Sequence, residues 1–274
     1  MGSIFKLYMI GTPLGNIEDI TLRARQHLED LPHIFAEDTR ELSKLLNLLN
    51  ISLEGKKLHS FSSHNMKEAT QLALNLLNES SVGFVSDRGM PAVSDPGAFL
   101  VQAARRNSVE VVPVPGPSAV TTLYSVSGFL ETSFHFIGFL PETKKERKEL
   151  WGQIKKWPLP TCFFESPRRI RESLEEIKKE FPKGEVFLGR EMTKQFEEFS
   201  FETLERLEVE QIQERGEFSV FLNPGKMDLS CPWEEEVQER LLSDKEWSKK
   251  VAERAEVSAS EVYNALQKIK KPRD

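Results

Sequence analysis

The sequence is poor in cysteine and in metal ligands. Of its 274 residues two are cysteines: Cys162, inside the apolar run TCFFE, and Cys231, in a polar stretch rich in turn residues. Two isolated thiols exclude a disulfide framework, and no cysteine and histidine have the spacing of metal ligands. We therefore expect no metal site and a reducing compartment, the cytoplasm.

Long hydrophobic runs and an excess of positive charge are also missing. No segment of about 18 apolar residues occurs, so the sequence predicts neither a membrane anchor nor an export signal. Lys and Arg total 37 against 43 Asp and Glu, which gives a formal net charge of −6. A nucleic acid partner would therefore need a local basic face.

The first part of the chain alternates short β-branched or aromatic runs with helical patterns. The expected strands are 6–10, 33–38, 57–62, 81–87 and 109–115, and the expected helices are 17–31, 39–50, 66–79, 96–107 and 118–127. This alternation is typical of βαβ units and a mostly parallel sheet.

The rest of the chain has fewer helices per strand. After Gly128 the expected strands are 134–140, 161–166, 185–191 and 216–223, and the expected helices are 144–157, 168–181, 233–242, 244–255 and 258–270. The polar stretch 223–232 is typical of a linker. The sequence thus predicts an α/β protein with a parallel-sheet domain (1–117), a mixed-sheet domain (118–224) and a linker with a small helical tail (225–274).

Three of the expected helices begin with the residue pattern of a capping box. The segments Asp38–Glu41, Asn65–Glu68 and Ser258–Glu261 have the required spacing. We therefore expect the side chain of the first residue to accept a backbone N–H in each.

Glycine and proline gather in the loops that follow the expected parallel strands. These loops read GTPLGN (11–16), EDTR (37–40), SDRGMPAVSDPG (86–97) and PGPSA (115–119). In any one loop these residues could simply form a turn. Ligands of an open parallel sheet bind outside the carboxyl ends of its strands, so four stiff loops at one edge favour a small-molecule cleft.

The common ligand motifs are missing. GTPLGN is not the dinucleotide fingerprint GxGxxG, and neither a GxxxxGK[ST] phosphate loop nor a GxSxG nucleophile elbow occurs. The residues alone therefore predict an α/β enzyme with a rigid cleft and leave its ligand open.

Eight segments, in this order and spacing, resemble the S-adenosylmethionine-dependent methyltransferases of the tetrapyrrole methylase superfamily: GTPLGNIEDITLRA, AEDTR, SDRGMPAVSDPG, VPVPGPSA, GFLP, FESPRR, REMTK and GEFSV. The chain is most similar to the ribosomal RNA small subunit (cytidine-2′-O)-methyltransferase family, because VSDPG stands where tetrapyrrole enzymes carry GGDP. The resemblance implies S-adenosylmethionine between two α/β domains, a homodimer, and small-subunit ribosomal RNA as substrate. It also implies that the thin GTPLGN turn forms one wall of the cleft.

Three residues depart from the pattern of the RNA family. Arg88 and Met90 stand where it usually has Ala and Thr, and Ala92 where it usually has Gly. They place bulk and a cation beside the expected cofactor loop. Two alternatives therefore stay open: a methylase of a tetrapyrrole or other small molecule, and a ribosome-binding protein without turnover.

The matching motifs imply which residues surround the cofactor. These are Pro13, Asp87, Met90, Val93, Ser94, Asp95, Pro115, Ser118, Ala119, Glu217 and Phe218.

A ribose 2′-hydroxyl is a poor nucleophile at neutral pH, so a base or a cation that favours the alkoxide is expected. The motifs offer Asp38, Glu165, Glu191 and Lys194 as catalytic candidates. The choice among them stays open, since Asp38 also fits a helix cap and Glu191 with Lys194 fits a structural ion pair.

For the RNA backbone, the motifs and the fork geometry of arginine favour Arg40, Arg168 and Arg169. Lys194 and the run KKERK (144–148) would extend that basic surface, although such a run also fits a solvated helix face.

Overall fold

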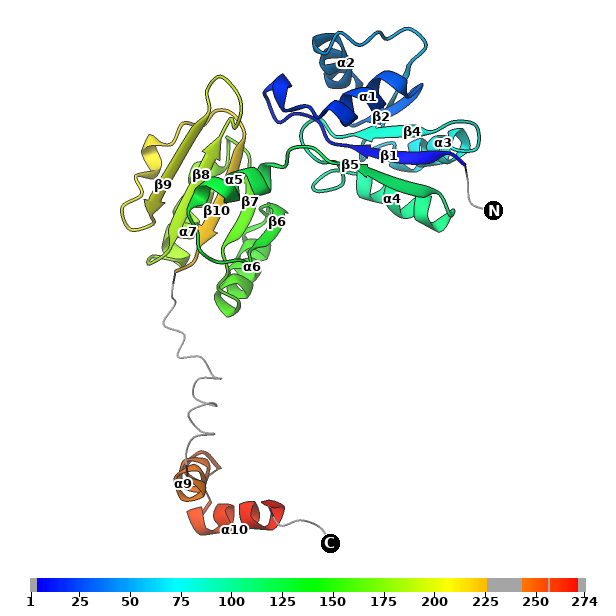
Figure 1. Cartoon of the computed structure of the whole chain (residues 1–274). Helices are drawn as coiled ribbons and strands as arrows, with labels where there is room; N and C mark the ends of the chain where they lie inside the picture. The colour runs from blue at the N-terminus through cyan, green and yellow to red at the C-terminus, as the bar shows by residue number, and fades with distance from the viewer. Residues whose placement is uncertain (1–3, 226–242, 256, 271–274) are drawn as a thin grey trace. The chain divides into compact units, whose positions relative to one another are not determined.

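The computed structural model describes residues 4–225, 243–255 and 257–270 (Figure 1). The chain divides into two compact units, Met1–Gly225 and Lys226–Asp274. The described part of the first unit contains two five-stranded sheets, and that of the second contains two helices.

The first sheet is parallel, with the strand order β3-β2-β4-β1-β5. Its strands are β1 (Lys6–Ile10), β2 (His33–Ala36), β3 (Lys57–Ser60), β4 (Val82–Val85) and β5 (Glu110–Val114). The predicted parallel sheet is thus confirmed. Pro113 is tolerated inside β5 because this strand lies at the edge of the sheet, where a missing N–H donor breaks no ladder.

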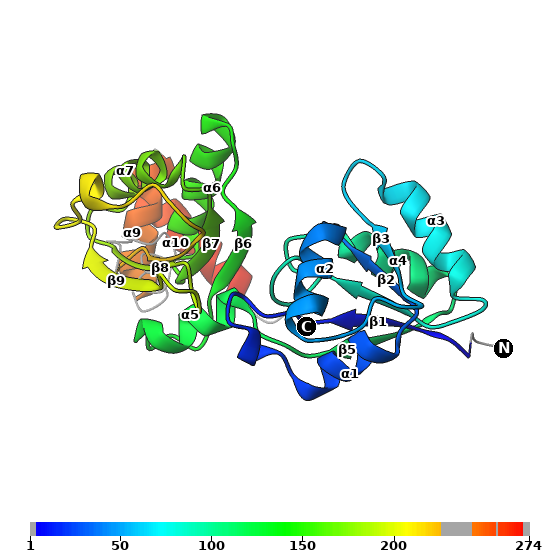
Figure 2. The same cartoon turned by 90° about the horizontal axis from the view of Figure 1, so that it is seen from above.

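Helices cover both faces of the parallel sheet (Figures 1 and 2). They are α1 (Leu22–Asp30), α2 (Thr39–Leu48), α3 (Met66–Leu76) and α4 (Gly97–Arg106), with a 3-10 turn, η1 (Ile17–Asp19), before α1. One apolar cluster joins α1 and α2 to Ile10 of β1, and a second joins α3 and α4 to Leu7 of the same strand. Both faces of the central strands are therefore buried, which explains why β4 reads as the continuous run VGFV.

The second sheet is mixed, with the order β6-β7-β10-β8-β9. Its strands are β6 (His135–Phe139), β7 (Thr161–Glu165), β8 (Glu185–Arg190), β9 (Glu198–Thr203) and β10 (Phe218–Asn223). Only β6 and β7 pair in parallel, as expected for a mixed sheet.

The helices of this second part are α5 (Ala119–Ser127), α6 (Lys144–Lys156) and α7 (Ile170–Glu180), with the 3-10 turn η2 (Val209–Gln211). Val120 and Leu123 of α5 pack in one cluster with Phe187 of β8 and Phe221 of β10. The helix that follows β5 thus belongs to the core of the mixed sheet.

Two expected elements differ from the structure. The predicted helix 17–31 is broken, because Thr21 is extended and its hydroxyl accepts the N–H of Ala24, so that α1 begins only at Leu22. The strand β9 was not predicted. It is an edge strand whose residues are mostly exposed, so its sequence EFSFET lacks a strong core pattern.

The three predicted capping boxes have different outcomes. Asp38 accepts the N–H of Arg40 at 2.8 Å, and Ser258 and Glu261 bond reciprocally at 3.1 and 3.3 Å. The prediction for Asn65 is wrong: its side chain makes no helix cap and instead accepts the N–H of Ser62 at 2.7 Å. Asn65 therefore stabilises the turn that precedes α3.

The second unit contributes α9 (Asp244–Ala255) and α10 (Ala259–Lys270) to the description. The expected helix 233–242 and Cys231 lie outside the described residues. Cys162 is a buried free thiol in β7. In the described part of the chain, no helix is long and apolar enough to cross a membrane.

Candidate active site

Two adjoining cavities open where the parallel strands end. The loops after β1, β2, β4 and β5 contribute residues such as Leu14, Glu37, Arg88 and Ser118. The larger cavity has a volume of about 550 Å³ and the smaller one about 110 Å³. They share Leu14, Arg88, Ser94, Ala119 and Phe164. Together they have the size of a small-molecule site, at the edge where an open parallel sheet binds ligands.

Apolar side chains from the mixed-sheet part of the chain form one wall of the larger cavity. Phe139, Phe164, Met192 and Phe218 line it, and Phe139 is 59% exposed. The two rings of Phe139 and Phe164 meet edge to face, with centroids 5.6 Å apart. This wall suits a flat, aromatic part of a ligand.

The smaller cavity is polar. Its walls carry the carboxyl groups of Glu37 and Asp95 and the hydroxyls of Ser94 and Ser118, with Arg88 at the boundary to the larger cavity. Such a pocket suits a small ligand part that carries charge and hydrogen-bond donors.

The loop 86–97 is held in place by its own carboxylate and by its neighbours. Asp95 accepts the N–H of Ala92 at 2.8 Å and that of Gly97 at 2.7 Å. Gly89 exchanges backbone hydrogen bonds with Thr12, at 3.0 and 3.1 Å. A rigid loop of this kind presents its cavity wall without the entropy cost of ordering it on binding.

The departures at Ala92 and Met90 have visible structural consequences. Ala92 has a φ of +67°, in the left-handed region that favours glycine. The Met90 sulfur lies 3.2 Å from the backbone nitrogen of Gly116, which donates to it. Ala92 therefore carries backbone strain, while Met90 ties the loop 86–97 to the loop after β5.

The glycines of GTPLGN permit close approaches between chain segments. A Cβ atom on Gly11 would lie 2.7 Å from the Cα of Gly116, so no side chain fits there. A Cβ atom on Gly15 would overlap the side chain of Lys194, and the N–H of Asn16 donates to Thr193 at 3.0 Å. The thin turn thus brings the end of β1 against the loop after β8, and its Leu14 lines both cavities.

Glu37 stands at the start of the loop after β2, partly buried in the smaller cavity. Burial, with the nearby carboxylates of Asp95 and Asp87, raises the pKa of Glu37 to about 7, and a backbone hydrogen bond from Asp87 opposes this only in part. Glu37 was not predicted from the sequence, because the next residue of the same motif, Asp38, was selected instead. Its place directly after a buried strand was the available signal.

The carboxylate of Asp38 forms an ion pair with Arg40. Its oxygens accept the Nε and Nη2 of that guanidinium, at 3.0 and 2.6 Å, besides the N–H that begins α2. These hydrogen bonds lower the pKa of Asp38 to about 2. A carboxylate with so low a pKa is a weak base, so Asp38 caps the helix and orients Arg40.

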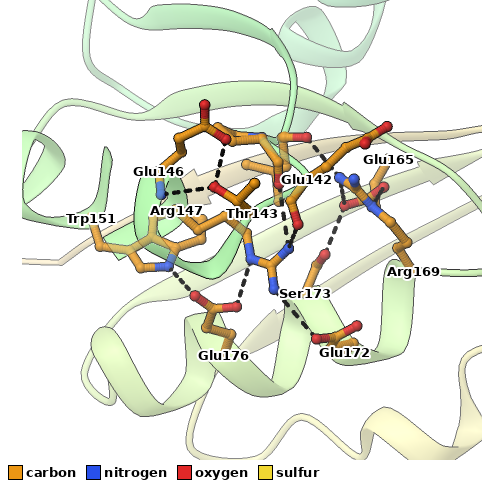
Figure 3. A network of polar contacts seen from close by, with 12 residues as sticks. Glu142, Thr143, Glu146, Arg147, Trp151, Glu165, Arg169, Glu172, Ser173 and Glu176 are labelled. Atoms are coloured by element: carbon orange, nitrogen blue, oxygen red, sulfur yellow. Dashed lines mark hydrogen bonds and ion pairs between the residues drawn. The ribbon is translucent and has the colours of Figure 1, made fainter. Parts of the chain in front are cut away.

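Glu165 lies at the end of β7 with its side chain 1% exposed (Figure 3). One oxygen accepts from the backbone of Ser166 and from Arg169 Nε, at 2.7 and 3.0 Å. The other accepts from Arg169 Nη2 and from the Ser173 hydroxyl, at 2.9 and 2.7 Å. Arg169 also donates to the carbonyl of Leu140 at 2.7 Å. With four donors, Glu165 organises the two loops at this rim of the cleft.

The run KKERK begins α6, and one of its residues faces inward. The side chain of Arg147 is 3% exposed and pairs with Glu176 at 2.8 Å and with Glu172 at 3.3 Å, both on α7 (Figure 3). The Trp151 ring donates to the same Glu176 at 2.8 Å. Arg147 therefore fastens α6 to α7, and it contributes neither to a basic surface nor to a solvated helix face, the two expectations for this run.

Glu191 and Lys194 form an ion pair that reaches the cleft through Glu217. Lys194 lies 2.7 Å from Glu191 and 2.9 Å from Glu217, and Glu191 also accepts the N–H of Glu217 at 2.8 Å. The lysine lowers the pKa of Glu191 against the effect of burial. Glu191 and Thr193 have φ values of +49° and +65°, so this loop carries backbone strain.

The residues predicted from the sequence fall into two groups. The cavity walls contain Asp87, Met90, Val93, Ser94, Asp95, Ser118, Ala119, Glu165, Glu217 and Phe218. The residues that lie outside these walls are Pro13, Asp38, Arg40, Pro115, Arg168, Arg169, Glu191 and Lys194. Besides Glu37, the apolar wall of Phe139, Phe164 and Met192 was not predicted from the sequence, since apolar residues that look buried carry no chemical signal of their own.

The described residues contain no group of three or more His, Cys, Asp or Glu side chains arranged to hold a metal ion. The polar side chains that line the cleft are carboxylates, hydroxyls and the guanidinium of Arg88.

This fold and cleft define an α/β enzyme of the methylase type. Residues 6–208 match the model of the tetrapyrrole (corrin/porphyrin) methylases, and the chain belongs to this family. It is 46% identical over 195 residues to the ribosomal RNA small subunit methyltransferase I of Thermotoga maritima, covering 71% of this chain and 86% of that protein. It is 36% identical over 267 residues to the enzyme of the same name from Neisseria meningitidis serogroup A, covering 95% and 91%.

The fold is also that of solved methyltransferase structures. The uroporphyrin-III C-methyl transferase of Thermus thermophilus in complex with S-adenyl homocysteine superposes with a TM-score of 0.55 at 17% identity, over 80% of this chain and 97% of that one. The predicted α/β fold of tetrapyrrole methylase type is confirmed.

Proposed function

We propose that this protein transfers a methyl group from S-adenosylmethionine to the 2′-oxygen of a cytidine in small-subunit ribosomal RNA. The observation that carries the proposal is a polar pocket that adjoins an apolar chamber at the ends of the parallel strands. The relatives named ribosomal RNA small subunit methyltransferase I support the substrate class, and the match to the Neisseria meningitidis enzyme covers 95% of this chain.

The side chains that line the two cavities fit S-adenosylmethionine. This cofactor has a flat aromatic base, and its amino-acid end carries an ammonium, a carboxylate and a nearby sulfonium. The aromatic wall of Phe164 and Phe218 suits the base, whereas Asp95 and Ser118 suit the charged end. The sulfonium supplies an activated methyl group, so the protein needs little covalent chemistry of its own.

The remaining task of the residues is to orient the substrate hydroxyl, exclude water and take up one proton. The rigid loop 86–97 and Ala119 would hold the cofactor, with Asp87 and Glu217 at its sides. Pro13 and Pro115 would act indirectly by keeping their loops stiff. Of the four catalytic candidates, Glu165 is saturated with donors and Asp38 is held by Arg40, so both are assigned to positioning.

RNA would approach over the rim of the cleft. Arg168 is exposed, and no ion pair or hydrogen bond within the described residues holds its guanidinium. Arg40 is exposed and oriented by Asp38, and both are suited to phosphate. Arg169 is held by Glu165 and would support the rim rather than bind RNA. The exposed ring of Phe139 offers a surface on which an unstacked base can lie.

The homodimer and the cytoplasmic location form part of the proposal. Exposed apolar side chains gather around the end of α5 and the edge strand β9, including Val126, Leu130 and Phe201. The ring of Phe129, next to Leu130, contacts that of Phe201 with centroids 6.4 Å apart. Such a face favours contact with a second subunit, and a ribosomal substrate favours the cytoplasm.

The function is tested with purified protein, methyl-labelled S-adenosylmethionine and small ribosomal subunits that lack the modification. Mass spectrometry of the RNA should show one 2′-O-methylated cytidine. Turnover on a porphyrinogen without RNA would support the small-molecule alternative instead. Absence of cofactor binding in calorimetry would contradict the enzymatic function and favour a ribosome-binding protein.

A further inference from the structure

We propose that Glu37 is the catalytic base of this cleft and accepts the proton of the substrate hydroxyl. The inference rests on the methyltransferase function proposed above. Glu37 is the first residue after β2, so the sheet delivers its carboxyl to the edge where the cavities open. It shares the smaller cavity with Ser94, Ser118 and Ala119, on the walls assigned to the cofactor. Its position therefore places a carboxylate beside the site of methyl transfer.

The other carboxylates of the cleft are engaged. Glu165 accepts four hydrogen bonds, and Asp95 accepts the two backbone N–H groups that hold its loop. Glu217 is paired with Lys194 and Arg88, and Glu41 with Lys44 at 2.6 Å. A base must have a free lone pair, and these groups would have to break an existing contact to supply one.

Three cleft carboxylates, Asp87, Asp95 and Glu37, form no salt bridge in the described part of the chain, and Asp95 is already engaged by two backbone N–H groups. Asp87 lines the larger cavity, is exposed, and accepts the N–H of Asp38 at 3.2 Å. Glu37 is more enclosed, and among the described residues its carboxyl accepts one hydrogen bond, from the backbone of Asp87. Enclosure matters because a base that is shielded from water does not lose its hydrogen bond with the substrate to solvent.

The charges around Glu37 suit proton transfer near neutral pH. The loop 86–97 places the carboxylates of Asp87 and Asp95 near Glu37, and its Arg88 lines the same cavity. The loops after β1 and β5 and the strand β7 contribute uncharged residues to the smaller cavity. Burial and the two aspartates hold the pKa of Glu37 at about 7. A base with this pKa is about half ionised at pH 7 and still has a useful affinity for a proton.

The step balances in atoms and charge. The 2′-oxygen forms a bond to the methyl carbon while the bond from that carbon to sulfur breaks, and the electron pair of the broken bond stays on sulfur. The hydroxyl proton passes to a carboxylate oxygen of Glu37 and leaves to water after product release. No other reactant is required.

The test compares wild type with Glu37→Gln, Glu37→Asp and Asp87→Asn, and uses Glu54→Gln, an exposed residue remote from the cleft, as matched control. Single-turnover methylation of unmodified small subunits is followed from pH 5.5 to 9. Glu37→Gln should lower the rate by roughly 100-fold or more and abolish the loss of rate below about pH 7. Glu37→Asp should retain that pH dependence at a reduced rate, and Glu54→Gln should behave as wild type.

Two further measurements separate a base from a cofactor ligand. Calorimetry should show S-adenosylmethionine bound by Glu37→Gln within about twofold of wild type, and thermal unfolding should show a folded protein. The carboxyl carbon of Glu37, assigned in NMR spectra by its loss in Glu37→Gln, should titrate near pH 7 in the free protein.

Several outcomes would overturn the assignment: a normal rate in Glu37→Gln, a parallel loss of cofactor affinity, or a rate loss confined to Asp87→Asn. If wild type itself transfers no methyl group to the subunits, the proposed function fails, and that failure is distinct from a failure of the inference.

Discussion

Arg88 Nε lies 3.3 Å from Glu217 Oε1, so the loop after β4 is ion-paired to the residue just before β10 across the cleft. The same guanidinium donates to the carbonyl of Leu14 at 3.0 Å. Arg88 is the single cationic residue among those that line the two cavities, whose walls also carry the carboxylates of Glu37, Asp87 and Asp95. It therefore offsets an acidic lining that would otherwise repel an RNA phosphate.

Replacing Arg88 by Ala should raise the KM for small subunits by roughly 10-fold, since one phosphate-attracting charge is lost. The ion pair is exposed, so the free energy of unfolding should change by less than about 1 kcal/mol. Steady-state kinetics and urea denaturation check both values. Glu217→Gln leaves the cation in place and should lower that KM or leave it unchanged. Equal increases in both variants would show that the pair itself, and not the cation, is what matters.

Ala92→Gly should stabilise the protein. An alanine in the left-handed region destabilises the folded protein by about 1 to 2 kcal/mol, and glycine removes this strain. Glycine also gives the unfolded chain more conformational entropy, which opposes the gain by about 0.4 to 1 kcal/mol. The expected gain is about 0.5 to 1 kcal/mol in the free energy of unfolding, measured with urea. Ala103→Gly, inside α4, is the matched control and should lose about 1 kcal/mol. A loss at both positions would contradict the strain at Ala92.

Glu37 should make stability depend on pH. Between 4.5, the usual pKa of glutamate, and about 7, the folded protein keeps a proton on Glu37 that the unfolded chain has released. Stability from this group is therefore full below about pH 4.5, falls as pH rises to about 7, and is constant above. The loss should be about 1 kcal/mol, reduced by the partial exposure of the carboxyl. Urea denaturation of wild type and of Glu37→Gln across this pH range measures the effect as the difference between their midpoints. A difference that does not change with pH would argue against it.

The neighbouring arginines 168 and 169 should respond differently to alanine. Arg168→Ala should weaken binding of small subunits several-fold at low salt and leave cofactor affinity and thermal stability nearly unchanged. Arg169→Ala should destabilise the protein by about 3 kcal/mol, because it leaves the buried carboxylate of Glu165 without its partner. Filter binding measures the affinity for small subunits, and denaturation measures the stability of both variants. An equal loss of stability in the two variants would refute the different roles assigned to Arg168 and Arg169.

Much of the fold was predictable because the hydrophobic pattern, the helix caps and the turn residues of the sequence indicate the same elements. The run VGFV indicates a strand buried on both faces, and β4 is such a strand. The edge strand β9 was not predictable in this way, since its side chains are mostly exposed and its pairing with β8 is set by the sheet.

The site was predictable to the level of its loops, but not to the role of each side chain. Asp38 and Glu37 are adjacent in one motif, and only the fold shows that Asp38 turns to Arg40 while Glu37 faces the cavity. Likewise, KKERK reads as a solvated basic face, and only the packing of α6 on α7 shows that Arg147 is buried. These distinctions depend on contacts between distant segments, which local patterns do not encode.

The acidic lining of the cleft has a consequence for repeated turnover under the proposed function. Methyl transfer converts a positively charged sulfonium into a neutral thioether. Carboxylates such as Asp87 and Asp95 attract the former more than the latter, so the lining distinguishes fresh cofactor from spent cofactor by charge alone. The cleft is thereby biased toward exchange after each reaction, and inhibition by its own by-product should be mild.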